Sequence, residues 1–170
     1  MFKILFSFLT LFFFLGCSPK HPPLPTVERV DLKQYAGTWY EIARFEHFFE
    51  KGCKNVSATY SLKEDGDIKV INRCEMIEDG EKKQAKGIAY ATDASNSKLK
   101  VSFFRPFYGD YWVIDLADDY SHAVVGAPNR EYLWILSRTK SIDTATKEDL
   151  LGTITSRGFD TKKLIWTIQE

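Results

Sequence analysis

The sequence predicts an all-β protein, an eight-stranded antiparallel up-and-down barrel with one C-terminal helix packed outside and a short final strand. Short runs of alternating apolar and polar residues recur at regular spacing from residue 37 to residue 138, which is typical of an antiparallel barrel or sandwich. One helical pattern follows at residue 143. Eight meandering strands, a helix and a strand do not follow the immunoglobulin-like order, and no Cys-Trp-Cys spacing of that class is present.

Turn residues separate the expected strands. Asp65-Gly66 predicts a hairpin between the second and third strands, and a second Asp-Gly pair at 79–80 precedes the fourth. A Pro-Gly loop at 106–109 divides the fifth strand from the sixth. We expect the eight strands at 37–46, 55–62, 67–74, 83–92, 98–104, 110–117, 122–127 and 131–138.

The expected helix covers residues 144–157. Asp143 is a suitable N-cap, and apolar residues at 150, 151 and 154 supply one buried face. Gly158 suits the left-handed residue that ends many helices. The last strand is expected at 164–168.

Alternation also predicts which side chains face the inside of the barrel. Several are Ala or Gly, which would not fill a core to normal packing density. An eight-stranded barrel can enclose one small ligand, although large neighbouring side chains could instead fill the space. The inward residues expected to contact a ligand are Ala58, Tyr60, Val70, Asn72, Gly87, Ala89, Val101, Phe103, Tyr132 and Trp134.

The N-terminal residues differ in composition from the rest of the chain. Lys3 is followed by an apolar run at 4–15, too short for a permanent helix across a bilayer. Residues 1–16 are therefore expected to be a signal peptide. The four residues ending in Cys17 resemble a bacterial lipobox, in which the Cys thiol receives a lipid, although Phe14 stands where Leu is usual. An ordinary signal peptide is the alternative.

We expect a lipidated Cys17 to begin the mature chain. The Pro-rich residues 17–30 are expected to form an extended tether that does not pack, followed by one domain at 31–170. Ser18 follows the cysteine, and the lack of an Asp at that position favours the outer membrane, with the domain in the periplasm.

Charge and cysteine content exclude some classes of site. Lys and Arg total 23, as do Asp and Glu, and this neutrality argues against nucleic-acid binding.

Cys53 and Cys74 are expected to form a disulfide in an oxidising compartment. With no His at ligand spacing, they do not predict a metal site. A tight turn at Asp65-Gly66 places Cys74 opposite Ser57, so the disulfide requires a bulge or a fold-back of residues 50–54.

Three blocks of the sequence resemble the lipocalin family. They are Gly37-Thr38-Trp39 with the preceding residues 31–35, Asp118-Asp119-Tyr120, and Arg138. "GTWYEIARF", "ATYSL" and "YLWILSRT" resemble in particular the bacterial lipocalin (Blc) subfamily of outer-membrane lipoproteins, over nearly all of residues 31–168. The resemblance implies that Trp39 closes one end of the barrel and that Arg138 lies across its ring as a structural pair.

The resemblance further implies a reversible carrier of fatty acids or lysophospholipids that needs no cofactor. Tyr108, in the loop at the open mouth, would cover an acyl chain while its hydroxyl meets water. Arg105 stands where the bacterial lipocalins have Gly. It either contacts a phosphate or carboxylate head group or is a solvated loop residue.

An enzyme and a structural envelope protein are the alternatives to a carrier. The sequence lacks the Gly-x-Ser-x-Gly elbow of an esterase, and His47 is interpreted as a rim residue and not as a general base. Some lipocalins act as enzymes through a cavity cysteine, which a free Cys74 would indicate. A purely structural envelope protein would bind no ligand. We expect a carrier and no enzyme. The sequence leaves open which lipid is bound and whether two copies form a homodimer.

Overall fold

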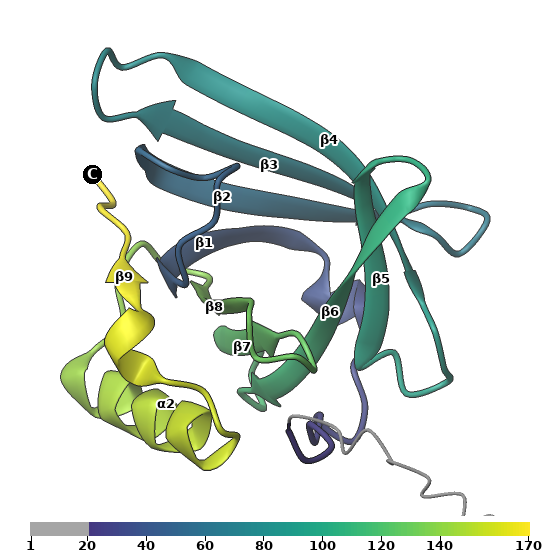
Figure 1. The fold of residues 1–170 in the computed structure, drawn as a ribbon. Coiled ribbons are helices and arrows are strands. Elements are labelled where there is room, and N and C mark those ends of the chain that lie inside the picture. The colour runs from purple at the N-terminus through teal and green to yellow at the C-terminus, as the bar shows by residue number, and fades with distance from the viewer. Residues whose placement is uncertain (1–20) are drawn as a thin grey trace, which may run out of the picture.

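The computed structural model describes residues 21–170, which form an antiparallel sheet closed into a barrel (Figure 1). Strands β1 to β8 follow one another around the sheet, and β1 pairs with both β2 and β8, which closes the ring. The predicted barrel is confirmed. Its strands are β1 (Gly37–Arg44), β2 (Cys53–Leu62), β3 (Ile68–Met76), β4 (Lys82–Ala91), β5 (Lys98–Phe104), β6 (Phe107–Leu116), β7 (His122–Gly126), β8 (Leu133–Ser137) and β9 (Ile165–Trp166).

The connections between strands alternate between the two ends of the barrel, because consecutive strands are antiparallel. The β1–β2, β3–β4, β5–β6 and β7–β8 connections share one end, which we call the mouth. The other three connections share the opposite end, the base, together with helix α1 (Leu32–Tyr35), which directly precedes β1.

The β2–β3 hairpin differs from the expected register by one residue. Leu62 pairs with Ile68, and the backbone N–H of Lys63 donates to the carbonyl of Asp67. The loop therefore has three residues and ends on Gly66, whose φ is +87°, a common hairpin form. Residues that pair directly point to the same face. The expected two-residue turn was wrong because it would have paired the inward residues of one strand with outward residues of the other.

A bulge in β2 brings the two cysteines together. The β2–β3 register shifts between Lys54 and Ser57, so Cys74 lies diagonally across from Cys53 with a Cα–Cα distance of 5.6 Å. The disulfide is formed. Both the predicted bridge and the predicted need for a bulge are confirmed.

Trp39 and Arg138 seal the base. Trp39 is 0% exposed, and the guanidinium carbon of Arg138 lies 3.8 Å from its ring centroid, a cation–π contact worth roughly 0.5–2 kcal/mol. Gly37 has φ +101°, and a Cβ there would lie 3.2 Å from Arg138. Arg138 therefore covers the Trp39 ring in the way the resemblance implies. The guanidinium also donates to the carbonyls of Gln34, Tyr35, Ala36 and Thr38.

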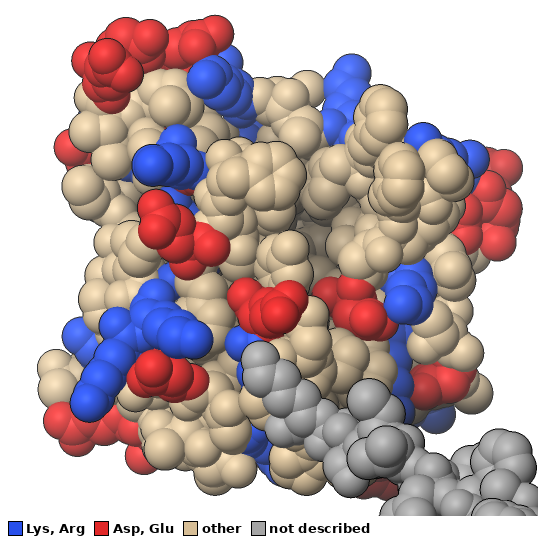
Figure 2. Space-filling view, viewed as in Figure 1, with Lys and Arg blue, Asp and Glu red and all other residues tan. Residues whose placement is uncertain are grey.

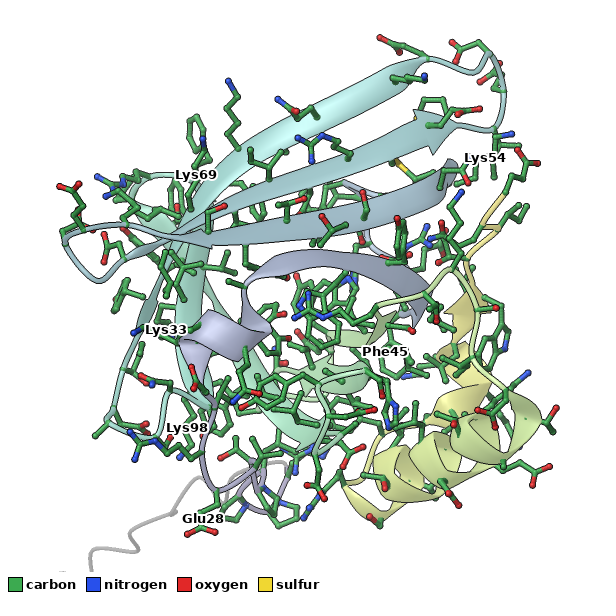
Figure 3. The ribbon with its side chains drawn as sticks, turned by 180° about the vertical axis from the view of Figure 1, so that it is seen from behind. Glu28, Lys33, Phe45, Lys54, Lys69 and Lys98 are labelled. Carbon is green, nitrogen blue, oxygen red and sulfur yellow. A yellow bond between two sulfur atoms is a disulfide. The ribbon has the colours of Figure 1, made fainter. Side chains whose placement is uncertain are left out.

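Helix α2 (Thr144–Ser156) lies against the outside of the barrel, as expected (Figures 1 and 3). The side chain of Asp143 accepts a hydrogen bond of 2.9 Å from the backbone of Thr146, and Gly158 has φ +81°. The helix buries Leu150 and Ile154 in a second apolar cluster outside the barrel wall. In the described part of the chain, no helix is long and apolar enough to cross a bilayer.

The C-terminal segment fills a gap where β2 diverges from β1. The β1–β2 pairing ends at Tyr40 and Ser57, and β9 continues along β1 instead. β9 is shorter than expected, but Asn55 still donates to the carbonyl of Ile168 over 2.8 Å. Lys54 forms a 2.7 Å ion pair with Glu170 beside this segment (Figure 3).

Residues 22–30 form a strap that packs along the barrel, so the expectation of an unpacked tether is wrong for them. Leu24 and Val30 are buried, since each finds an apolar pocket on the barrel. Val27 donates to the carbonyl of Val113 over 3.0 Å, and Arg130 donates to the carbonyl of Pro22 over 3.0 Å. The expected signal peptide and Cys17 lie outside the described residues.

Candidate ligand cavity

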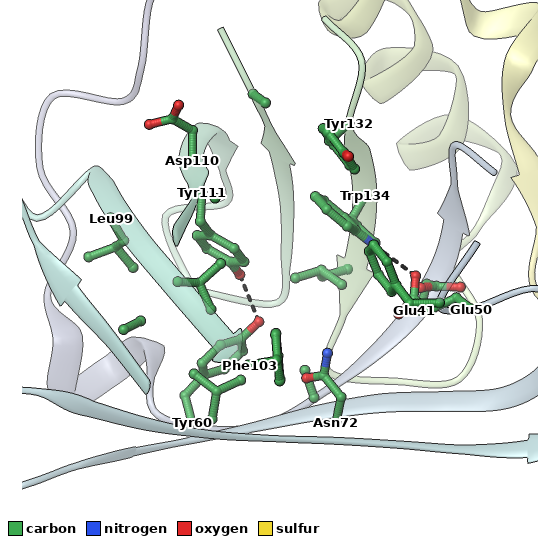
Figure 4. A pocket seen from close by; sticks show the side chains of 18 of the residues that line it. Glu41, Glu50, Tyr60, Asn72, Leu99, Phe103, Asp110, Tyr111, Tyr132 and Trp134 are labelled. Atoms are coloured by element: carbon green, nitrogen blue, oxygen red, sulfur yellow. Dashed lines mark hydrogen bonds between the residues drawn. The ribbon is translucent and has the colours of Figure 1, made fainter. Parts of the chain in front are cut away.

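A cavity of about 530 Å³ lies inside the barrel and opens at the mouth (Figures 2 and 4). Its volume is within the ~300–1,000 Å³ typical of small-molecule sites. Most of its wall is apolar, and it contains ten of the eleven residues expected to contact a ligand. They are Ala58, Tyr60, Val70, Asn72, Ala89, Val101, Phe103, Tyr108, Tyr132 and Trp134.

Gly87, the eleventh, lies behind the cavity wall. A Cβ at this position would be 2.8 Å from the ring of Phe103 and 2.8 Å from the carbonyl of Ser102. The missing side chain therefore makes room for the Phe103 ring, which itself lines the cavity. Gly87 shapes the site through Phe103 and does not face the ligand space.

Three tyrosines form a hydrogen-bonded floor above the base. The hydroxyl of Tyr111 lies 2.8 Å from that of Tyr35 and 2.9 Å from that of Tyr60, and the Tyr60–Tyr111 bond is visible in Figure 4. Burial raises the pKa of all three, that of Tyr60 to about 12. The floor is therefore uncharged at neutral pH, and its hydroxyls already satisfy one another.

A buried charged cluster interrupts the apolar wall beside Trp134. Arg44 donates to Glu41 over 3.0 Å and to the carbonyl of Glu50 over 2.8 Å. The indole N–H of Trp134 donates to Glu50 over 3.3 Å (Figure 4). Burial, and then the Glu50 charge, raise the pKa of Glu41 to about 7 against the opposing effect of Arg44. Both carboxylates line the cavity, so its wall is apolar only in part.

His47 holds the mouth loop 45–52 against the barrel. Its ring stacks on Phe49 at 5.1 Å and on Tyr132 at 4.8 Å between centroids. His47 lies in the loop at the mouth, where a rim residue was expected, and its side chain is buried there. Burial, with a smaller effect of Arg44, lowers its pKa to about 4, and its Nε2 has no hydrogen-bond partner within residues 21–170.

Two other residues singled out in the sequence, Cys74 and Arg105, do not supply a reactive group to the cavity. The disulfide to Cys53 consumes the thiol of Cys74, which removes the route to an enzyme through a free cavity cysteine. Arg105 is exposed at the end of the β5–β6 hairpin and is not part of the cavity wall.

Comparison with known proteins agrees with this architecture. Residues 30–169 match the family model described as a lipocalin-like domain. The chain is 49% identical to the outer membrane lipoprotein Blc of Escherichia coli K12, over 93% of this chain and 91% of that protein. It is 43% identical to the protein of the same name from Vibrio cholerae, over 91% and 92%.

Solved structures share the fold at lower identity. Insecticyanin from the tobacco hornworm superposes with a TM-score of 0.71 at 23% identity, covering 88% of this chain and 86% of that one. The sealed base, the open cavity and the family match lead to one conclusion: the chain belongs to the lipocalin family.

Proposed function

We propose that this lipocalin is an outer-membrane-anchored carrier that reversibly binds a fatty acid or a lysophospholipid in its cavity. The acyl chain points toward the tyrosine floor, and the head group stays at the mouth. One observation carries the proposal: the barrel holds an apolar space that is sealed at one end and open at the other. Such a space suits an amphiphile with one long apolar end.

The energetics favour reversible binding. Burial of about 14 methylenes releases roughly 11 kcal/mol at about 0.8 kcal/mol each. Loss of ligand freedom offsets part of this and leaves about −8 kcal/mol, or micromolar affinity. The proposal requires no catalytic step, and storage, transport and envelope maintenance all need ligand release.

The anchor in this proposal is a lipid on Cys17. The apolar run, the lipobox-like residues before Cys17 and the name of the relatives, outer membrane lipoprotein, support it. Cys17→Ser is expected to release the protein to the soluble periplasm, which fractionation of cells would detect. A variant that stays as membrane-bound as the parent contradicts the anchor.

Filling the cavity tests the binding site. Ala89 is buried in the wall, so Ala89→Trp is expected to occupy ligand space and abolish binding of fatty acid and lysophospholipid in a calorimetric titration. Lys86→Trp, an exposed position on the same strand, is the matched control and should bind like the parent. Circular dichroism checks that both variants fold. If Ala89→Trp binds lipid as tightly as the parent, the ligand is not in the barrel.

A further inference from the structure

Exposed aromatic side chains gather at the mouth. Phe48 is 89% exposed, Phe104 is 76% exposed and Phe107 is 71% exposed. Phe48 comes from the β1–β2 connection, and Phe104 and Phe107 are the last residue of β5 and the first of β6, with their rings stacked at 6.3 Å. Single exposed apolar residues are ordinary, but a group of large ones around one opening marks an interaction surface. We call these three residues the aromatic rim.

The face around the opening is mostly uncharged. Figure 2 shows the hollow in the middle of this face, with uncharged side chains over most of its edge and acidic side chains along its lower border. Phe49 and Tyr108 line the cavity and are also exposed. The apolar surface therefore continues from the aromatic rim into the cavity.

The strap shows which end of the barrel faces the proposed anchor. At the base, Val30 donates to the carbonyl of Ser95 in the β4–β5 connection. At the mouth, Arg130 in the β7–β8 connection holds the carbonyl of Pro22. The strap thus runs along the barrel from base to mouth when followed toward the N-terminus. Arg130 also donates to the carbonyl of Arg157 over 3.0 Å, which fixes this end of the strap to the barrel and to the end of α2.

The distance from the strap to the anchor is short. Cys17 precedes Pro22 by five residues, and five extended residues span at most about 18 Å. A lipid on Cys17 is therefore confined to the vicinity of the mouth. A tether of the same length that began at the base would instead have held the base close to the bilayer.

We propose that the aromatic rim docks on the bilayer that holds the anchor, with the mouth of the cavity facing the lipids. This inference rests on the lipidation of Cys17 in the proposed function. Aromatic rings partition into the interface of a bilayer, and Arg105, between Phe104 and Phe107 in the sequence, supplies a cation for anionic head groups. A docked mouth lets a lipid enter the cavity without its acyl chain crossing bulk water.

Depth-sensitive quenching tests the orientation. The lipidated full-length protein is reconstituted into vesicles of phosphatidylethanolamine and phosphatidylglycerol with brominated acyl chains. Phe104→Trp, at a rim position outside the cavity wall, should add emission that the brominated chains quench. Leu62→Trp is the matched control, because Leu62 is an apolar residue 40% exposed at the base, and its added emission should stay unquenched. Equal quenching of the two, or quenching at Leu62 alone, overturns the proposal.

Removal of the aromatic rim tests the contact itself. In the mature Cys17→Ser protein, Phe48→Ser with Phe104→Ser, at two rim positions outside the cavity wall, should weaken binding to the same vesicles by about tenfold for each phenylalanine, while Leu62→Ser should not. The rim variant should still bind fatty acid in solution, and Ala89→Trp should still bind vesicles. These readouts separate failure of docking from failure of the cavity or of the anchor.

A second copy of the chain could cover the rim instead. Sedimentation of the parent in solution tests this outcome. A dimer that the double rim variant abolishes, together with vesicle binding that the variant leaves unchanged, would overturn the membrane assignment. A monomeric parent with rim-dependent vesicle binding supports it.

Discussion

The base and the mouth of the barrel are built from opposite chemistry. At the base, Trp39 is wholly buried, its indole N–H donates to the carbonyl of Tyr35, and Arg138 covers its ring. At the mouth, phenylalanines face solvent and a loop is held by a buried ion cluster. This difference assigns stability to the base and ligand exchange to the mouth, so substitutions at the two ends should have separable effects.

The largest expected effect is at the base. Trp39→Ala removes the largest fully buried side chain and should lower the free energy of unfolding by about 3–5 kcal/mol. Phe104→Ala at the mouth should change it by less than about 0.5 kcal/mol. Urea denaturation with the disulfide intact measures both. Equal losses of unfolding free energy in the two variants would contradict the assignment of stability to the base.

The disulfide is the next largest contribution. Replacing both cysteines, Cys53→Ser with Cys74→Ser, opens a loop with a sequence separation of 21 and should lower stability by about 3 kcal/mol. Thermal unfolding of the double variant against the oxidised parent is the measurement. Two free thiols in the unreduced parent, counted by mass after alkylation, would show that the bridge is not formed in the protein.

The buried carboxyl of Glu41 should make stability depend on pH. Its pKa is about 7 in the folded protein against an ordinary 4.5. Between these values the folded state keeps a proton that the unfolded state loses, so the free energy of unfolding falls as pH rises. The protonated carboxyl stabilises the folded state fully below pH 4.5. This stabilisation, about 3 kcal/mol, is lost as the pH rises from 4.5 through 7.

The Glu41→Gln variant isolates this effect. The amide cannot ionise, so the stability of the variant relative to the parent should rise from pH 4.5 to pH 8. Denaturation series at several pH values test it, with Glu46→Gln on the exposed side of the mouth loop as control. A relative stability that stays constant with pH, or falls, would show that Glu41 is ionised throughout.

The smallest expected effect concerns the strap. Arg130→Ala removes hydrogen bonds to the carbonyls of Pro22 and Arg157 and should destabilise the protein by about 1–2 kcal/mol. Hydrogen exchange should increase at Val27, whose N–H bonds to Val113. Arg105→Ala, at an exposed position, should change neither. Unchanged protection at Val27 would mean that the strap is held without Arg130.

The sequence predicted the barrel well because its signal is local. Alternation at period two assigned the inward faces of β2, β3 and β4, so most of the cavity wall could be named in advance. The same alternation from Trp39 also assigns Glu41 to the inward face, so the sequence carries a local signal for this carboxylate. Glu50 had no such signal, since it lies in a loop whose place at the wall depends on its contacts with Arg44 and Trp134.

The strap and the hairpin register depended on contacts that no local pattern reports. Proline-rich composition predicted an unpacked segment, yet Leu24 is buried against residues far along the chain. In the β2–β3 hairpin, the Asp-Gly pair favoured a two-residue turn, but the inward faces of both strands required three. In this hairpin, the need to pair inward residues with inward residues sets the register, and the turn residues do not.

Quenching by a brominated fatty acid tests the central claim most directly, that lipid binds inside the barrel. Trp134 lines the cavity, whereas Trp166 lies outside the barrel beneath Lys147 at 3.8 Å. Saturable quenching at one ligand per protein should be largely lost in Trp134→Phe and retained in Trp166→Phe. Quenching that survives in Trp134→Phe and disappears in Trp166→Phe would place the lipid on the outer surface and contradict the account.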